Sequence, residues 1–327
     1  MLLRKKQYKY DIAAIGEALI DFVPSPYNDN EEDSLTFKGN PGGAPANVLA
    51  SSSKLGSRTA FIGKVGNDVF GDLLIRTLSQ AGICVTSMII TDEHPTTLAF
   101  VSLDKKGDRS FSFYRNQTAD CMLVSTEIDR NVLASSRIFH FGSVSMTTEP
   151  SRTATLDAVK LSKQLGAVIS FDPNLRPLLW SCLDEAKRVI LSAFEYSDIV
   201  KLSEDELLFL TEISDLKQAM ENLYNKYCFK TLVVTLGAKG SVAVNRSGIY
   251  TDNGFSVQTK DTTGAGDAFW GAFLYYLTDH KILEVVDRTD LTDALKFADA
   301  SGALSTTEYG AIPSFASLEK IHSLYAI

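Results

Sequence analysis

The segment 261–272, Asp-Thr-Thr-Gly-Ala-Gly-Asp-Ala-Phe-Trp-Gly-Ala, holds residues suited to binding an anion. Apolar residues recur at helical spacing after Gly264, which predicts a helix that begins near this glycine. The free N–H groups and the positive dipole end of a helix start can hold a phosphate. Asp267 falls in the first turn, where its carboxylate could act as a general base beside that anion. Aspartate is also common at helix starts for the dipole alone, and this purely structural role remains the alternative.

Two common glycine-rich nucleotide motifs do not occur in this chain. The P-loop pattern G-x-x-x-x-G-K-[ST] is absent, and the dinucleotide pattern G-x-G-x-x-G would need glycine where the chain has Phe269. The first predicted strand ends in Gly16-Glu17-Ala18, without the glycine-rich turn of a dinucleotide-binding fold. A nicotinamide-dependent oxidoreductase is therefore disfavoured.

A second glycine-rich segment, 39–47, also precedes a predicted helix. Its adjacent glycines, Gly42 and Gly43, would let a ligand touch the backbone. Asn47 can offer both a donor and an acceptor to a hydroxyl group. Taken alone the segment could be a turn and a helix cap, but together with 261–272 it favours a binding site.

Short β-branched runs alternate with segments of helical period over most of the chain. This alternation predicts an α/β fold with one large, doubly wound, mostly parallel sheet flanked by helices. The predicted strands are 12–16, 59–62, 137–141, 168–172, 199–202, 232–236 and 255–259. The predicted helices are 46–55, 70–81, 153–165, 204–210 and the helix that follows Gly264.

Two stretches, 18–38 and 96–115, contain strand-like segments with no helix between them. In the second, segments 98–103 and 109–115 flank the polar turn 104–108, which predicts a hairpin. Both stretches leave the ends of core strands, so we expect them to meet in a small β-sheet lid over one edge of the main sheet. Two unconnected surface hairpins are the alternative. The chain, 1–327, is predicted to form a single domain.

The composition is that of a globular protein, with 45% hydrophobic and 22% charged residues among 327, which excludes disorder, collagen and coiled coil. The net charge of -8 has the wrong sign for a general binder of nucleic acid or anionic membrane. The four cysteines are far apart, which argues against structural zinc and a disulfide framework. No window is apolar enough for a membrane span, and the N-terminus lacks a signal-peptide core. We therefore expect a reduced, cytoplasmic protein.

In its motifs the sequence resembles the ribokinase-like (phosphofructokinase-B type) carbohydrate kinases, and within them the fructokinases. The segments that carry the resemblance are GGAPANVLASSSKLG (42–56), GKVGNDVFG (63–71), FSFYRNQTAD (111–120), HFGSVSM (140–146), SFDPNLRPLLW (170–180), VKLSEDEL (200–207) and DTTGAGDAFWGA (261–272). The resemblance implies a ribokinase-like fold and ATP-dependent phosphorylation of D-fructose to fructose 6-phosphate. A kinase of 2-keto-3-deoxygluconate or ribose, and an inactive sugar-binding regulator, remain as alternatives.

The resemblance also implies roles for individual residues. Asp267 would be the catalytic base, and the backbone of Gly264, Ala265 and Gly266 would hold the transferring phosphoryl group. The implied sugar-binding residues are Asp21, Gly42, Gly43, Asn47, Arg115, Asn174 and Arg176. Both arginines could instead be ordinary surface or ion-paired residues. His140 is expected to be a core histidine rather than a catalyst.

On the nucleotide side the implied residues are Lys201, Glu206, Thr235, Gly237, Gly240 and Asp299. Mg²⁺ would bridge the nucleotide phosphates, with Glu206 helping to place it through water. The segment 235–241 could also be a tight turn between strands. A monovalent cation such as K⁺ would be held near Asp261, Thr263, Gly310 and Ser314. The expected partners are a small sugar and ATP, with no nucleic acid or membrane, and a homodimer through the lid is also implied.

The sequence departs from the usual family pattern at four places. One is the segment 116–120, which reads Asn-Gln-Thr-Ala-Asp where Asn-Pro-Ser-Ala-Asp is more frequent. Ser203 occupies the first position of the family's N-x-x-E element, which puts direct metal or phosphate contact there in doubt. Asp299 stands where such enzymes often carry asparagine near the adenine, so the nucleotide preference is less firmly implied. Leu49 stands where small residues are usual.

Overall fold

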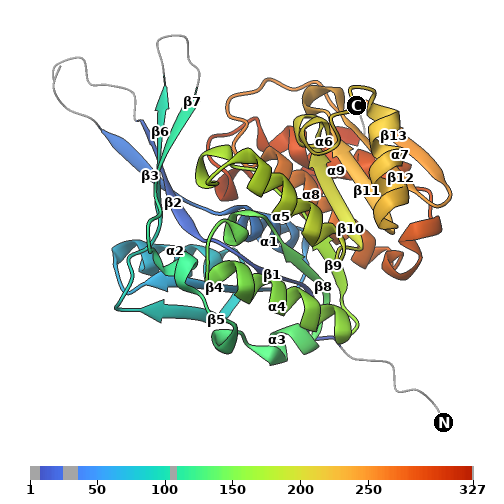
Figure 1. Ribbon diagram of the computed structural model, residues 1–327. Coiled ribbons are helices and arrows are strands. Elements are labelled where there is room, and N and C mark those ends of the chain that lie inside the picture. The colour runs from blue at the N-terminus through green and yellow to red at the C-terminus, as the bar shows by residue number, and fades with distance from the viewer. Residues whose placement is uncertain (1–7, 25–35, 104–108, 326–327) are drawn as a thin grey trace.

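The computed structural model describes residues 8–24, 36–103 and 109–325. Its large sheet consists of β1 (Tyr10–Ile15), β4 (Thr59–Gly66), β5 (Ile83–Thr91), β8 (Ser136–Phe141), β9 (Val168–Phe171), β10 (Ile199–Ser203), β11 (Thr231–Thr235), β12 (Ser241–Asn245) and β13 (Gly248–Asp252). The strand order is β13-β12-β11-β10-β9-β8-β1-β4-β5. Figure 1 shows helices on both faces of this sheet. The predicted doubly wound α/β fold is confirmed.

The strand order reverses between β1 and β8. These two strands pair in parallel, and β1 also pairs in parallel with β4. In open α/β sheets, the carboxyl ends of the strands at such a reversal border the crevice that binds ligands. The last two strands, β12 and β13, pair antiparallel and extend the sheet beyond the predicted strands.

The helices divide between the two faces of the large sheet. One face carries α1 (Ala44–Leu55), α2 (Val69–Gln80), α8 (Ala265–Asp279) and α9 (Thr292–Ser305), with α10 (Leu318–Tyr325) packed on α9. The other carries α3 (Arg130–Ala134), α4 (Ser151–Gln164), α5 (Leu183–Phe194), α6 (Glu204–Thr211) and α7 (Leu216–Tyr227).

The strand β1 shows why both faces are covered. Its residues Ile12 and Ala14 belong to the core under α1 and α8, whereas Ala13 and Ile15 belong to the core under the other helix layer. Successive side chains of a strand point to opposite faces, so a continuous apolar run is buried on both sides. All four residues are fully buried.

A second, smaller sheet forms the predicted lid and stands off one end of the main body (Figure 1). It consists of β2 (Leu19–Pro24), β3 (Phe37–Gly42), β6 (Leu98–Leu103) and β7 (Arg109–Tyr114) in the order β3-β2-β6-β7. The two predicted stretches meet where β2 pairs in parallel with β6. The lid therefore forms as expected, although β3 runs beyond residue 38 to Gly42. Residues 25–35 and the predicted turn 104–108 lie outside the described residues.

The prediction of a strand over 255–259 is wrong. The chain turns away from the sheet at Gly254, which has a left-handed φ of 70°. The backbone of Gly254 packs against that of Gly240, and residues 255–259 belong to no strand. They line a cavity described below. Across the described residues, no helix is long and apolar enough to cross a membrane.

Candidate active site

Helix α8 begins where the sequence predicts. Gly264 caps it with a left-handed φ of 76°, and a Cβ there would lie 2.7 Å from the Cβ of Ala311. Both the backbone conformation and the close packing therefore favour glycine. Asp267 lies in the first turn and is only 9% exposed.

The two glycine-rich segments of the sequence meet in space. Asn47 Nδ2, from the first turn of α1, donates to Asp267 Oδ2 at 2.9 Å. The hydroxyl groups of Ser51 and Ser52 donate to the α8 carbonyls of Ala268 and Gly271 at 3.0 and 2.7 Å. Small and hydroxyl side chains thus bring α1 and α8 together and align their N-terminal ends.

The carboxyl group of Asp267 has a raised pKa. Burial raises it to about 6, partly opposed by the hydrogen bond from Asn47, while the charge of Asp172 adds to the increase and Lys201 and Arg176 reduce it. At neutral pH the group is therefore mostly ionised, yet remains able to take up a proton. This is the balance that suits a general base.

A cavity of about 320 Å³ lies between the lid, α1 and the start of α8. Its polar lining includes Asp21, Asn47, Asn174, Arg176 and Asp267. The main-sheet crevice and the lid therefore enclose a site lined by carboxylate, amide and guanidinium groups, which can pair with several hydroxyl groups at once.

The lid contributes Asp21 to this cavity. Burial raises the pKa of Asp21 to about 6, opposed by Arg176 and supported by the charge of Asp267. Gly42, across the β2–β3 pair, lies so close to this side chain that an added Cβ would stand 2.5 Å from Asp21 Oδ2. Gly43 lines the cavity with its backbone.

Asn174 and Arg176 follow the end of β9 and both line the cavity. Asn174 adopts a left-handed φ of 45°, and its N–H donates to Asp172 Oδ1 at 3.1 Å. A non-glycine residue in this conformation is unusual and is found more often at functional sites. Because Arg176 lines the cavity, its position favours the predicted sugar-binding role over that of an ordinary surface arginine.

The structure does not bring Arg115 into the cavity lining. Its side chain is 4% exposed and pairs with Asp120 Oδ2 at 2.7 Å. It also donates to Thr147 Oγ1 at 2.6 Å and to the carbonyl of Val144 at 3.1 Å. Val144 itself lines the cavity. The guanidinium group therefore supports the cavity wall from behind, because its donors are directed at Asp120 and the 144–147 segment.

A second cavity, of about 580 Å³, lies on the other side of the α8 start. Four of the predicted nucleotide-side residues line it, namely Thr235, Gly237, Gly240 and Asp299. Ala265 and Gly266 also face this cavity, whereas Gly264 and Asp267 face the smaller one, and Thr262 lines both. The start of α8 therefore separates two adjoining cavities. The segment 235–241 is both a turn between β11 and β12 and part of this wall.

Lys201 and Glu206 lie behind this arrangement rather than on either cavity wall. Lys201 Nζ pairs with Asp172 Oδ2 at 2.6 Å and would stand 3.2 Å from a Cβ added at Gly266. Burial opposes the charge of Lys201, but the neighbouring carboxylates outweigh it and raise the lysine pKa. The carboxylate of Glu206 accepts the N–H groups of Leu175 and Ser203 at 2.7 and 2.8 Å.

The predicted cation residues gather at the loop before α8. Asp261 Oδ1 accepts from the N–H and hydroxyl group of Thr263 at 3.0 and 2.7 Å, and Asp261 Oδ2 accepts from the N–H of Gly310 at 2.9 Å. Ser314 donates to the carbonyl of Ala311 at 2.7 Å. Carboxylate, hydroxyl and carbonyl oxygens are the donors that hard cations use. Among the described residues no cluster of three His, Cys, Asp or Glu side chains could hold a metal ion.

The expectation for His140 is confirmed. The ring is 1% exposed, and its Nδ1 shares a hydrogen bond with Ser170 Oγ at 3.0 Å. Burial, with a contribution from Lys201, lowers the pKa of His140 to about 3. A histidine held neutral in this way does not exchange protons near neutral pH.

Two residues of the site were not singled out by sequence reasoning. Glu17 lines the smaller cavity, its Oε1 accepts the N–H of Ala44 at 3.0 Å, and burial raises its pKa to about 7. Asp172 holds Lys201 at the end of β9. Asp172 is the last residue of a predicted strand and Glu17 directly follows another, which was a usable signal for both, because strand ends border the crevice.

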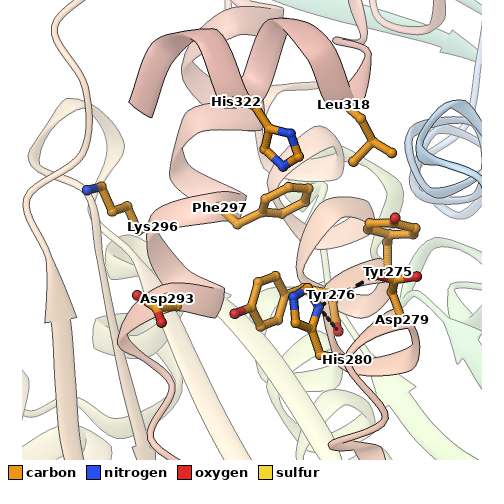
Figure 2. Close-up of a pocket in the computed structure, with 9 residues that line it drawn as sticks. All are labelled: Tyr275, Tyr276, Asp279, His280, Asp293, Lys296, Phe297, Leu318 and His322. Atoms are coloured by element: carbon orange, nitrogen blue, oxygen red, sulfur yellow. Dashed lines mark hydrogen bonds and ion pairs between the residues drawn. The ribbon is translucent and has the colours of Figure 1, made fainter. Parts of the chain in front are cut away.

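A further cavity, of about 530 Å³, lies between α8, α9 and α10 (Figure 2). Its walls include Phe297, His322 and the stacked rings of Tyr276 and His280, whose centres are 3.8 Å apart. It lies at the C-terminal end of α8, away from Asp267, and none of the predicted site residues lines it.

Comparisons with known proteins agree with this arrangement. The model of the pfkB family carbohydrate kinases matches residues 9–317. The chain is 41% identical over 316 residues to "Probable fructokinase-4" of Arabidopsis thaliana, covering 96% of each protein. It resembles the structure of fructokinase with bound ATP from Xylella fastidiosa, with a TM-score of 0.88, 32% identity and coverage of 97% and 98% of the two chains.

A fructokinase double mutant from Vibrio cholerae O395, solved with fructose, ADP and potassium ion bound, is also similar. Its TM-score is 0.84 at 32% identity, with 98% of this chain and 99% of that chain covered. The matches extend over the large sheet, the lid and the segments that form both cavities. The chain therefore belongs to the pfkB family of carbohydrate kinases, which are phosphotransferases.

Proposed function

We propose that the protein phosphorylates D-fructose with ATP and releases fructose 6-phosphate and ADP. The observation that carries this proposal is the pair of cavities that adjoin at the start of α8, with Asp267 facing one and the backbone of Ala265 and Gly266 facing the other. A phosphoryl group that passes between the cavities must cross this helix start. The similarity to fructokinases supports fructose as the acceptor.

The reaction is an in-line displacement. The 6-hydroxyl oxygen of fructose attacks the γ-phosphorus of ATP, and the bond from that phosphorus to the bridging oxygen of ADP breaks. Asp267 takes the hydroxyl proton as the new bond forms. The N–H groups of Gly264 and Gly266, with the positive end of α8, stabilise the charge on the transferring group. The N–H of Ala265, predicted to share this role, donates to the carbonyl of Thr262 at 3.2 Å.

The sugar occupies the smaller cavity in this proposal. Asp21 and Asn47 pair with its hydroxyl groups from opposite walls, and Asn174 and Arg176 do so from the end of β9. The backbone of Gly42 and Gly43 lets the sugar approach closely. Arg115 acts through Val144, whose carbonyl it holds.

The larger cavity holds ATP. Thr235, Gly237, Gly240 and Asp299 form its wall, and the buried ammonium group of Lys201 adds positive charge behind Gly266. Mg²⁺ would neutralise charge on the nucleotide phosphates, with Glu206 helping to place it through water. K⁺ near Asp261, Thr263, Gly310 and Ser314 would order the loop that leads into α8.

The choice of sugar is tested with a substrate panel. We expect ATP-dependent ADP release with the highest kcat/KM for fructose among fructose, 2-keto-3-deoxygluconate, ribose and tagatose. A higher kcat/KM for 2-keto-3-deoxygluconate or ribose would replace the proposed acceptor. Sugar binding without ADP release from any of the four would favour the inactive regulator.

We also propose a cytoplasmic location and a homodimer through the lid. The four cysteines are all free thiols, as is usual in a reducing compartment. The lid face opposite the sugar cavity carries the contacting rings of Phe22, Phe37, Phe100 and Tyr114, and Tyr114 is 65% exposed. Cell fractionation tests the location. Light scattering of the wild type and of Tyr114→Asp tests the dimer, and a monomeric wild type contradicts it.

A further inference from the structure

The cavity between α8, α9 and α10 has aromatic walls and lies apart from the proposed active site (Figure 2). The rings of Tyr276 and His280 stack with their centres 3.8 Å apart, and the centre of the Phe297 ring lies 5.6 Å from that of Tyr276. The ring centres of Tyr275 and His322 lie 5.9 and 6.3 Å from that of Phe297. These rings line a space of about 530 Å³, which is the size of a site for a small organic molecule.

Two carboxylates belong to the same wall. Asp279 and Asp293 line the cavity together with the rings. Burial raises the pKa of Tyr275, and the charge of Asp279 raises it further. Burial also raises the pKa of Tyr276, and there the charge of Asp293 adds to the increase. Each tyrosine of the wall therefore lies in the field of a carboxylate.

The position of Asp279 is unusual for a carboxylate. It is the last residue of α8, where the negative end of the helix dipole favours a cation. The last turn of α8, all of it within the described residues, carries no lysine or arginine. Asp279 Oδ2 lies 3.8 Å from Nδ1 of His280, but a histidine compensates for its charge only when protonated. Negative charge is therefore concentrated at this end of α8.

The charges and the rings together favour an organic cation over an anion or a metal ion. The opposing charge on the wall is that of Lys296, and Figure 2 shows its ammonium group directed away from the rings. In the part of the chain that the structure describes, no three His, Cys, Asp or Glu side chains gather closely enough to hold a metal ion. The face of an aromatic ring attracts a cation through the quadrupole of the ring.

We propose that this cavity binds a small organic cation that carries an alkylated ammonium group. The ammonium group lies against the aromatic faces between Asp279 and Asp293, and its apolar carbons contact Phe297 and Leu318. An alkylated ammonium group suits such a wall because its charge is spread over apolar carbons, which lose little hydration against a ring. The site is separate from the two cavities at the start of α8, and it does not depend on the proposed phosphorylation of fructose.

Choline is the probe that tests the charge requirement. It is titrated into the protein without sugar or nucleotide, at constant K⁺ concentration and ionic strength, and NMR shifts of the protein report binding. The matched probe is its neutral isostere, in which a tert-butyl group replaces the trimethylammonium group. We expect saturable binding of choline, and binding of the isostere that is weaker by at least about fivefold. Absence of saturation, equal affinity for the isostere, or tighter binding of the anion benzoate would each overturn the inference.

Variants assign the binding to this cavity. Asp279→Asn and Asp293→Asn keep the shape of the side chain and remove its charge, and each should weaken choline binding by about two- to fivefold. Tyr276→Leu removes a ring and should have an effect of similar size. Glu221→Gln, on α7 at the other face of the sheet, removes the same charge from an exposed position and should leave the affinity unchanged.

Thermal unfolding confirms that each variant is folded. A choline affinity that Asp279→Asn, Asp293→Asn and Tyr276→Leu all leave unchanged would overturn the inference, as would an equal loss in Glu221→Gln. Because no sugar or nucleotide is present, these binding results do not depend on whether the protein phosphorylates fructose.

Discussion

At the scale of single residues, the proposed chemistry depends on one carboxylate, that of Asp267, held by the side-chain amide of Asn47. The hydrogen bond from Asn47 to Asp267 fixes the orientation of the proposed base and joins α1 to α8. Burial of the same carboxylate raises its proton affinity. Position and basicity are therefore set by the same packing of α1 against α8.

The variant Asp267→Asn should lower kcat at least about 100-fold, because it removes the base while keeping size and helix geometry. Sugar and nucleotide should still bind. A merely structural aspartate at a helix start would instead cost about 1 kcal/mol of stability and leave turnover per folded molecule unchanged. Thermal unfolding and kcat measured on one preparation separate the two, and a folded variant with near wild-type kcat rules out the proposed mechanism.

The cation residues lead to a second residue-scale prediction. Asp261 organises both Thr263 and the backbone of Gly310 directly before the helix start. Replacing K⁺ by a bulky organic cation at constant ionic strength should lower kcat, and added K⁺ should restore it. A kcat that does not depend on K⁺ would contradict the proposed monovalent-cation site. It would not contradict the proposed phosphoryl transfer.

At the scale of elements, the lid and the segment after β8 form one side of the smaller cavity, where we propose that the sugar binds. Arg115, directly after β7, connects them through Asp120, Thr147 and Val144. Both charged groups of the Arg115–Asp120 pair are almost fully buried. Removal of one partner would leave the other charge buried without compensation.

The variant Arg115→Ala should raise KM for fructose while KM for ATP stays nearly unchanged, because the supported wall borders only the smaller cavity. Loss of the buried pair is also expected to destabilise the fold by roughly 3–5 kcal/mol. Thr147→Val, which keeps the ion pair and removes the two hydrogen bonds of the Thr147 hydroxyl group with Arg115 and the carbonyl of Val144, is the milder companion variant. An equal increase of KM for both substrates in either folded variant contradicts a sugar-side role.

The contact between α1 and α8 gives a second element-scale prediction. A Cβ at Gly271 would lie 2.5 Å from the carbonyl oxygen of Val48, so Gly271→Ala should push the helices apart and destabilise the protein by about 1–3 kcal/mol. Gly302, inside α9, is a matched helical control. A Cβ added there would have the carbonyl oxygen of Ala265 as its nearest contact, at 3.3 Å. Both substitutions gain helix propensity. Chemical denaturation should show Gly271→Ala clearly less stable than Gly302→Ala, and equal stabilities would contradict the packing argument.

At the scale of the whole molecule, several buried acids of the crevice hold protons more tightly than they would in the unfolded chain. The pKa of Glu17 is raised to about 7 and that of Asp299 to about 8, both mainly by burial. The folded state therefore binds more protons than the unfolded state near neutral pH. The stability that these groups contribute is present at lower pH and is lost as pH rises through their folded pKa values.

We therefore expect the free energy of unfolding to fall by about 2 kcal/mol between about pH 6.5 and about pH 8.5. The buried His140 changes the free energy of unfolding in the opposite direction, because its pKa is lowered in the folded state. The stability that it contributes is lost only as pH falls below the pKa of histidine in the unfolded chain. Denaturation curves at the two pH values measure the change. Asp299→Asn and Glu17→Gln should each reduce it, and a wild-type stability that rises over this range would contradict the assignment.

The sequence by itself determined the class of fold and the two halves of the site. Hydrophobic period is a local property, so the alternation of strands and helices, the lid hairpin and the helix start at Gly264 could all be predicted. The segments 39–47 and 261–272 were identified because glycine and small polar residues have distinct backbone and hydrogen-bonding chemistry. The pattern could not exclude a strand at 255–259, since turning away at Gly254 depends on contact with Gly240.

Only the tertiary structure decided which side chains meet. Asn47 and Asp267 are 220 positions apart, and their contact depends on the order of strands in the sheet. The direction of Arg115 toward Asp120, the burial of Lys201 behind Gly266 and the hydrogen bond from Ser241 to Asp299 depend on packing in the same way. Proton affinity and charge compensation depend on neighbours brought in from distant parts of the chain, so local sequence does not specify them.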